Sequence, residues 1–160
     1  MIELVLMRHG HALSAQESGH RGDAGRKLSQ NGKAQITVSA GRLKGLGFSP
    51  GIIISSPFLR AIETADIAAE HFPAAKRVTE PALVSTDPLS GILNAIAAAA
   101  ASEPSVLVIG HQPTLGALCS LLLKSDSLPF STGGFAYLRL SDGPGSVKAE
   151  LADFFAPEPI

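Results

Sequence analysis

Three short runs of strand-forming apolar residues, each followed within two positions by a polar or basic residue, constrain the fold of this chain most strongly. The runs are Leu4–Met7, Ile52–Ile54 and Val106–Ile109. Continuous apolar runs of this length are typical of parallel strands that are buried on both faces of a sheet. Helical patterns separate the runs, so we expect helical crossovers between strands of one sheet.

The first two crossover helices carry recognisable start signals. Ser29 is expected to cap a helix that ends near Leu46, and Ser56 to cap the next, with Pro57 as its first residue. Helical spacing predicts the buried faces, which are Ile36, Ala40 and Leu43 in the first helix and Phe58, Ile62, Ala65 and Ala69 in the second.

The second half of the chain continues the alternation and then changes to a hairpin. A short strand is expected at Arg77–Thr79. Two further helices are expected, one before and one after the strand at Val106–Ile109. Their predicted buried faces are Leu89, Ile92, Leu93 and Ile96 in the first, and Leu115, Leu118, Cys119 and Leu122 in the second. The alternating runs Phe135–Leu140 and Val147–Leu151, joined by Ser141–Gly145, predict the hairpin. The pattern indicates a three-layer α/β/α sandwich with a mostly parallel sheet and one antiparallel strand near an edge.

Length and charge restrict the partners. With 160 residues and 45% hydrophobic residues, the chain is expected to form one domain over positions 1–160 and to be a monomer. A formal net charge of -1 gives no basic field for nucleic acid or an anionic membrane surface. The longest apolar tracts reach about half of the ~20 residues that a membrane span needs. The single cysteine, Cys119, and the lack of a basic amino-terminal region favour a cytoplasmic protein.

Basic residues follow three of the expected strands. Arg8 and His9 follow the first, Arg60 lies in the first turn after the second, and His111 follows Ile109. Because the carboxyl ends of parallel strands meet at one edge, we expect these four side chains to share a crevice. Four potential cations with no evident carboxylate predict an anion site.

The placement of Arg60 has two interpretations. A cation in the first turn of a helix opposes the helix dipole by ~0.3–1 kcal/mol, and a bound anion would reverse that effect. Alternatively, Arg60 forms an ion pair with Glu63 three residues on, which is worth only ~0.2–0.5 kcal/mol.

The residue types favour phosphate chemistry. A guanidinium binds phosphate through two parallel hydrogen bonds, and two arginines are present. An unprotonated imidazole is a nucleophile toward phosphorus, and a second, protonated imidazole can stabilise the developing charge. This division between His9 and His111 requires no cofactor and no metal. His11 follows two residues after His9, without partners at a familiar metal-site spacing, so we expect it at the pocket rim.

Four segments resemble the histidine phosphatase superfamily, also described as phosphoglycerate-mutase-like. They are Leu6–Gly10, Arg26–Gly32, Ser55–Ala65 and Val108–His111. The short chain and the run from Ser56 to Thr64 are most similar to the SixA-type phosphohistidine phosphatases within that superfamily.

The resemblance implies a fold and roles for particular residues. It implies six strands in the order 3-2-4-1-5-6 with the fifth antiparallel. His9 would become phosphorylated, and Arg8, Arg60 and His111 would form the phosphate pocket, with Arg26 as a further contributor.

One departure from the superfamily concerns the general acid. Mutases and many acid phosphatases carry a carboxylic acid after the third strand, but neither Glu80 nor Asp87 matches that pattern. Asp87 remains a candidate acid, although it also suits a helix cap before Leu89. A phosphoramidate leaves more readily than an alkoxide, so a phosphohistidine substrate tolerates a missing acid.

These observations predict a metal-independent phosphatase that acts on phosphohistidine in a carrier or signalling protein. No stretch is long enough for a capping subdomain, so we expect a shallow, open pocket. One alternative is a phosphomonoesterase for a sugar or nucleotide phosphate that uses the same site. Another, of a different class, is a phosphate-recognition module with little turnover.

Overall fold

The computed structural model describes residues 1–84, 88–143 and 146–158. Six strands form one sheet in the order β3-β2-β4-β1-β5-β6, and β5 runs antiparallel to both neighbours, whereas the other pairs are parallel. The predicted strand order and the antiparallel fifth strand are confirmed. The strands are β1 (Ile2–Arg8), β2 (Ile52–Ser55), β3 (Lys76–Thr79), β4 (Ser105–Gly110), β5 (Phe135–Gly143) and β6 (Ser146–Phe155).

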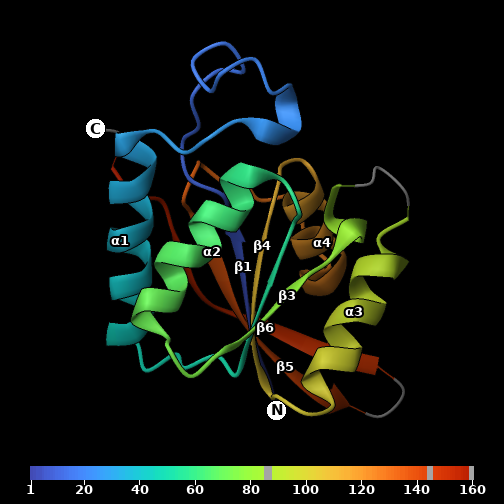
Figure 1. The fold of residues 1–160 in the computed structure, drawn as a ribbon. Helices are drawn as coiled ribbons and strands as arrows, with labels where there is room; N and C mark the ends of the chain where they lie inside the picture. Colours follow the sequence, from blue (N-terminus) through green and yellow to red (C-terminus); the bar gives the residue numbers. More distant parts are fainter. Residues whose placement is uncertain (85–87, 144–145, 159–160) are drawn as a thin grey trace.

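Helices cover both faces of the sheet, which gives the predicted three layers (Figure 1). Helices α1 and α2 pack on one face, and α3 and α4 on the other. The helices are α1 (Gln30–Gly45), α2 (Leu59–His71), α3 (Ser90–Ala100) and α4 (Thr114–Leu123), with short 3-10 helices η1 (Asp23–Gly25) and η2 (Pro81–Val84). Within the described ranges, no helix combines the length and the hydropathy of a membrane span.

The central strands are apolar on both sides because each side meets a helical layer. In β1, Leu4 and Leu6 face the layer of α3 and α4, whereas Val5 and Met7 face that of α1 and α2, and none of the four is exposed to solvent. Burying such a side chain contributes roughly 1.5–3 kcal/mol. The alternation of β4 is the same, which explains why both strands read as uninterrupted apolar runs.

Helix α1 begins as predicted. The Ser29 hydroxyl accepts a hydrogen bond from the Gly32 amide at 3.0 Å, so it satisfies one of the free amide groups of the first turn. Ile36, Ala40 and Leu43 are buried against the sheet, as their spacing predicts.

The predicted start of α2 is wrong. The helix begins at Leu59, Phe58 occupies the capping position without a side-chain bond, and Pro57 lies outside the helix. The Ser56 hydroxyl instead contacts His111 Nε2 at 2.7 Å and accepts from the Phe58 amide at 3.2 Å. The Ser56 hydroxyl, which the sequence predicts as the cap of α2, is therefore used for a tertiary contact with His111.

The buried face of α2 is also rotated from the predicted one. It consists of Arg60, Ala61, Thr64, Ala65 and Ala68, so Ala65 alone belongs to both sets. The Thr64 hydroxyl donates to the Arg60 carbonyl and accepts from the Gly10 amide, at 2.8 and 3.1 Å. This rotation directs Arg60 and Thr64 toward the end of β1.

The remaining differences are small. Strand β6 continues beyond the predicted end at Leu151 to Phe155. Residues 144–145, in the predicted turn of the hairpin, lie outside the described residues.

Cys119 is buried in the core, and burial raises the pKa of its thiol to about 12, which suits a packing role.

Candidate active site

The two histidines meet because β1 and β4 are neighbouring parallel strands. Arg8 pairs with Gly110 in the register of these strands, and His9 and His111 follow directly. The His9 amide donates to the Gly110 carbonyl at 3.1 Å, and the ring centroids of the two histidines lie 5.1 Å apart. The structure thus brings Arg8, His9 and His111 to one edge, as the strand pattern predicts.

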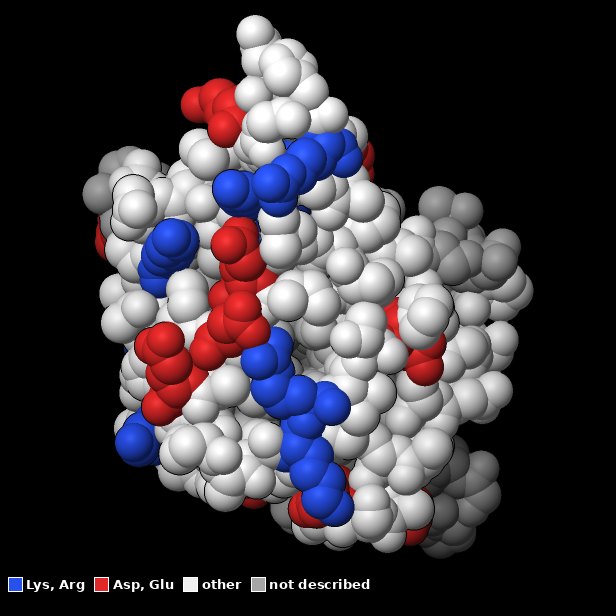
Figure 2. Space-filling view, in the orientation of Figure 1, with Lys and Arg blue, Asp and Glu red and all other residues white. Residues whose placement is uncertain are grey.

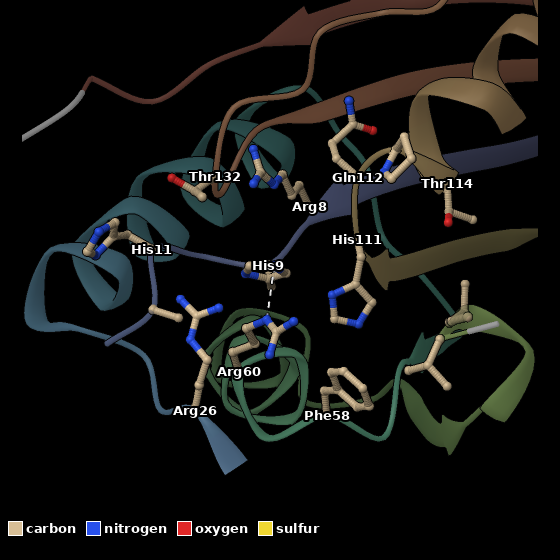
Figure 3. A pocket seen from close by; sticks show the side chains of 14 residues that line it. Arg8, His9, His11, Arg26, Phe58, Arg60, His111, Gln112, Thr114 and Thr132 are labelled. Atoms are coloured by element: carbon tan, nitrogen blue, oxygen red, sulfur yellow. Dashed lines mark hydrogen bonds between the residues drawn. The ribbon is translucent and has the colours of Figure 1, made fainter. Parts of the chain in front are cut away.

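These residues open into a cavity of about 460 Å³ at the carboxyl end of the sheet (Figure 3). The segment between β1 and α1 arches over this end in Figure 1. The cavity is lined by Arg8, His9, His11, Ala12, Arg26, Phe58, Arg60, Leu83, Val84, His111, Gln112, Pro113, Thr114 and Thr132.

Arg60 enters the cavity from the first turn of α2 and is only 7% exposed. Its Nε donates to His9 Nε2 at 3.3 Å, and a terminal nitrogen donates to the Asp23 carbonyl oxygen at 2.7 Å. Its ion pair among the described residues is with the Asp23 carboxylate at 3.3 Å. The alternative interpretation, an ion pair with Glu63, is not found in the part of the chain that the structure describes, and Glu63 accepts a hydrogen bond from the Leu28 amide instead.

Hydrogen bonds define the tautomer of His9. Its Nδ1 lies 2.8 Å from the Gly10 carbonyl oxygen, which can only accept, so the ring proton is on Nδ1. The lone pair is then on Nε2, which faces Arg60. Burial, and then the nearby His111, Arg60 and Arg8, lower the pKa of His9 from 6.5 to about 3, although the bond to Gly10 opposes the shift. His9 is therefore neutral near pH 7.

His111 contacts the Ser56 hydroxyl, and its ring lies at a T-shaped angle to that of Phe58, with centroids 5.2 Å apart. Burial is the main cause that lowers its pKa to about 4, and Arg60 and Arg8 add to the effect. The expected protonated His111 is therefore not the state of the free protein. A bound phosphate dianion would favour the protonated ring and raise this pKa.

The positive charge of the cavity thus comes from arginines. Arg8 donates to the Phe130 carbonyl oxygen at 3.0 Å, and its pKa is lowered by burial and by Arg60. Its Nε and His111 Nδ1 are buried and have no hydrogen-bond partner among the described residues. Unsatisfied buried groups are rare and costly in proteins, so two of them beside one cavity indicate a polar ligand there.

The outer part of the site contains Arg26 and His11. Arg26 lines the cavity, donates from Nε to the Leu13 carbonyl oxygen at 2.8 Å and forms an ion pair with Asp23. His11 is exposed at the cavity, with its Nδ1 2.7 Å from the Ser29 hydroxyl. Asp87, the candidate acid, lies outside the described residues.

Sequence reasoning missed Asp23, and the expectation that no carboxylate belongs to the cluster is wrong. The available signal was its position three residues before Arg26 in the glycine-rich segment. Among the described residues, no group of three or more His, Cys, Asp or Glu side chains is arranged to hold a metal ion.

Two glycines allow the segment after β1 to pack against the start of α1. A Cβ atom on Gly10 would lie 2.7 Å from the Gly32 carbonyl oxygen, and one on Gly32 would lie 2.1 Å from that of His11. Both obstructions are backbone atoms that cannot move aside alone. This close approach fixes the chain directly after His9.

Replacing Gly32 by alanine is therefore expected to lower the free energy of unfolding by about 1–3 kcal/mol, the usual cost of overpacking. Gly41 provides a matched control in the same helix, since a Cβ there meets nothing within 4 Å. Gly41→Ala should stabilise the protein by about 0.4–1 kcal/mol. Urea unfolding of both variants checks the pair, and equal effects would contradict this packing.

The low pKa values of His9 and His111 predict an unusual titration. In nuclear magnetic resonance spectra, their ring signals should remain those of neutral imidazole from about pH 8 to about pH 5, whereas in urea they should titrate near 6.5. Between about pH 6.5 and pH 4, the unfolded state therefore binds more protons than the folded state. The free energy of unfolding should fall as the pH falls through this range. A folded-state midpoint near 6.5 would contradict the burial of these rings.

Comparison with known proteins shows the family and the fold of this chain. The family model of the histidine phosphatase superfamily (branch 1) matches residues 4–88, which is more than half of the chain. The phosphohistidine phosphatase SixA of Escherichia coli (strain K12) is 31% identical over 157 residues, covering 94% of each chain. A structure of the protein histidine phosphatase SixA complexed with tungstate superimposes with a TM-score of 0.84 at 27% identity, covering 98% of this chain and 97% of that one.

The fold also occurs with another substrate. A mycobacterial glucosyl-3-phosphoglycerate phosphatase has a TM-score of 0.73 at 18% identity, covering 99% of this chain and 100% of that chain. Shared fold therefore does not identify the substrate, which must be argued from the site. By the family match and the 31% identity to SixA over nearly the whole chain, this chain belongs to the histidine phosphatase superfamily.

Proposed function

We propose that this protein is a metal-independent phosphatase that hydrolyses phosphohistidine on a partner protein, with a covalent intermediate on His9. The observation that carries the proposal is the state of His9, whose neutral ring presents the Nε2 lone pair among guanidinium groups. A neutral imidazole is the nucleophilic form. Similarity to SixA over nearly the whole chain supports phosphohistidine as the substrate.

The reaction would proceed in two displacements at phosphorus. His9 Nε2 forms a bond to phosphorus while the bond from phosphorus to the substrate imidazole breaks, and the leaving nitrogen takes a proton from solvent water. A second water then attacks phosphorus and releases a proton to solvent, the bond to His9 breaks, and inorganic phosphate leaves. Arg8, Arg60 and Arg26 would bind the phosphoryl oxygens.

His111 would add a hydrogen bond to the phosphoryl group. Ser56 Oγ accepts from the Phe58 amide with one lone pair and would donate its own proton to His111 Nε2, so that the His111 proton would be on Nδ1. This Nδ1 is the buried group without a described partner. The phosphoryl group would supply its acceptor and, as a dianion, favour the doubly protonated ring.

The other wall of the cavity suits an imidazole leaving group. Phe58, Leu83, Val84 and Pro113 line it with apolar surface, and the Asp23 carboxylate beside the cavity is an ionised partner of Arg60 and Arg26 rather than a proton donor. A flat ring can pack on such a wall, and a phosphoramidate does not depend on a strong general acid. Both features favour phosphohistidine over an alkyl phosphate.

A protein substrate also suits the surroundings. Lys and Arg side chains are interspersed with Asp and Glu on the face drawn in Figure 2, so that face carries no continuous field of one sign. Outside the cavity, recognition of a histidine-phosphorylated carrier or signalling protein would depend on local contacts at the rim, where His11 is exposed.

A substrate panel in metal-free buffer tests the proposal. It compares a histidine-phosphorylated carrier protein with sugar, nucleotide and other alkyl phosphates, each with wild type and with His9→Ala. We expect the highest kcat/KM on phosphohistidine and loss of turnover in the variant. Higher kcat/KM on an alkyl phosphate would indicate the small-molecule phosphomonoesterase, and binding without turnover would indicate a recognition module.

A further inference from the structure

In the free protein, the Asp23 carboxylate forms ion pairs with two of the arginines that line the cavity. One carboxylate oxygen lies 3.3 Å from Arg60 and the other 3.3 Å from Arg26. Figure 3 shows these two arginines on the same side of the cavity as His9. The carboxylate thus binds two guanidinium groups through separate oxygens, as a phosphoryl group would bind them.

Two contacts from Asp23 reach Arg60, and they differ in kind. The backbone carbonyl oxygen accepts from Arg60 at 2.7 Å, a normal strong hydrogen bond. The carboxylate contact is longer, and the Asp23 side chain is 63% exposed. The backbone contact therefore orients Arg60 whatever side chain stands at position 23, whereas the carboxylate mainly contributes charge that a stronger ligand can displace.

The charge state of Asp23 fits this picture. Partial burial alone would raise the pKa of its carboxyl, but Arg60 and Arg26 outweigh burial and lower the pKa overall. Asp23 is thus an anion near pH 7 and lies within contact distance of two of the arginines that we assign to phosphate binding.

We propose that Asp23 is an internal competitor for the phosphoryl group, so that it sets the affinity of the site for phosphate. This inference rests on the proposed function, because it requires that Arg60 and Arg26 bind phosphoryl oxygens. On substrate binding the carboxylate gives up its contacts to the phosphoryl group. After hydrolysis it returns to the arginines and favours release of inorganic phosphate, the reaction's own product.

The test compares Asp23→Asn with wild type by calorimetric titration of inorganic phosphate and by phosphate inhibition of turnover. Asp66→Asn is the matched control, since it removes the same charge from an exposed carboxylate that pairs with Arg77 on the surface. We expect Asp23→Asn to bind phosphate about two- to fivefold more tightly, the effect expected for removal of an exposed ion pair. Asp66→Asn should bind phosphate as wild type does.

Three results separate the alternatives. Tighter phosphate binding with a KM lowered by the same factor and no gain in kcat supports the competitor role. Unchanged or weaker phosphate binding in Asp23→Asn, with wild type still binding, overturns it. If wild type itself does not bind phosphate, the proposed function fails, and the inference fails with it.

Discussion

Replacing His9 by alanine is expected to lower kcat on a histidine-phosphorylated protein by at least about 10³-fold, the scale seen when a catalytic nucleophile is removed. The structure offers no equivalent replacement, because His111 Nε2 is engaged with Ser56. Phosphate binding should largely persist, since the arginines remain. Rapid kinetics under saturating substrate, combined with a phosphate titration, measures both quantities.

The control for His9 is His71→Ala. His71 ends α2 and contacts the Ile67 carbonyl oxygen away from the cavity. This variant should retain the wild-type kcat. Near-normal turnover by His9→Ala would refute its assignment as the nucleophile, whereas equal losses in both variants would indicate a general effect on folding.

Replacing Arg60 by lysine is expected to lower kcat/KM by about 10²–10³-fold, although the charge is conserved. The guanidinium contacts His9, the Asp23 carbonyl oxygen and the Asp23 carboxylate at once. An ammonium group on a flexible chain cannot keep this forked geometry. Removal of one preorganised donor to transition-state charge costs enzymes about this factor.

Arg77→Lys is the matched control, because Arg77 forms an exposed ion pair with Asp66 on the surface. Exposed pairs contribute only about 0–1 kcal/mol, so this variant should behave as wild type in turnover. Comparable kcat/KM values for Arg60→Lys and Arg77→Lys would contradict a specific role of the Arg60 fork.

The central sheet and the meeting of Arg8, His9 and His111 could be predicted from the sequence for a simple reason. Uninterrupted apolar runs specify strands that are buried on both faces, and parallel neighbours bring their carboxyl ends to one edge. The polar residue that follows such a run is then placed to within a few ångström by topology alone.

The parts that could not be predicted depend on contacts distant in sequence. The cap expected from Ser56 is lost because its hydroxyl meets His111, 55 positions later. Asp23 lies in a segment without periodicity, so nothing local specifies that it turns back onto Arg60. The low pKa values of His9 and His111 arise from burial, which exists only once the layers have assembled.

The most direct test of the account is to trap the intermediate. Wild-type protein would be mixed with a histidine-phosphorylated carrier, quenched in alkali to preserve phosphohistidine, digested and analysed by mass spectrometry. We predict one phosphoryl group on the peptide that contains His9, formed and lost at the rate of turnover and absent in His9→Ala. Turnover without a phosphoryl group on His9 at any time would contradict the covalent mechanism.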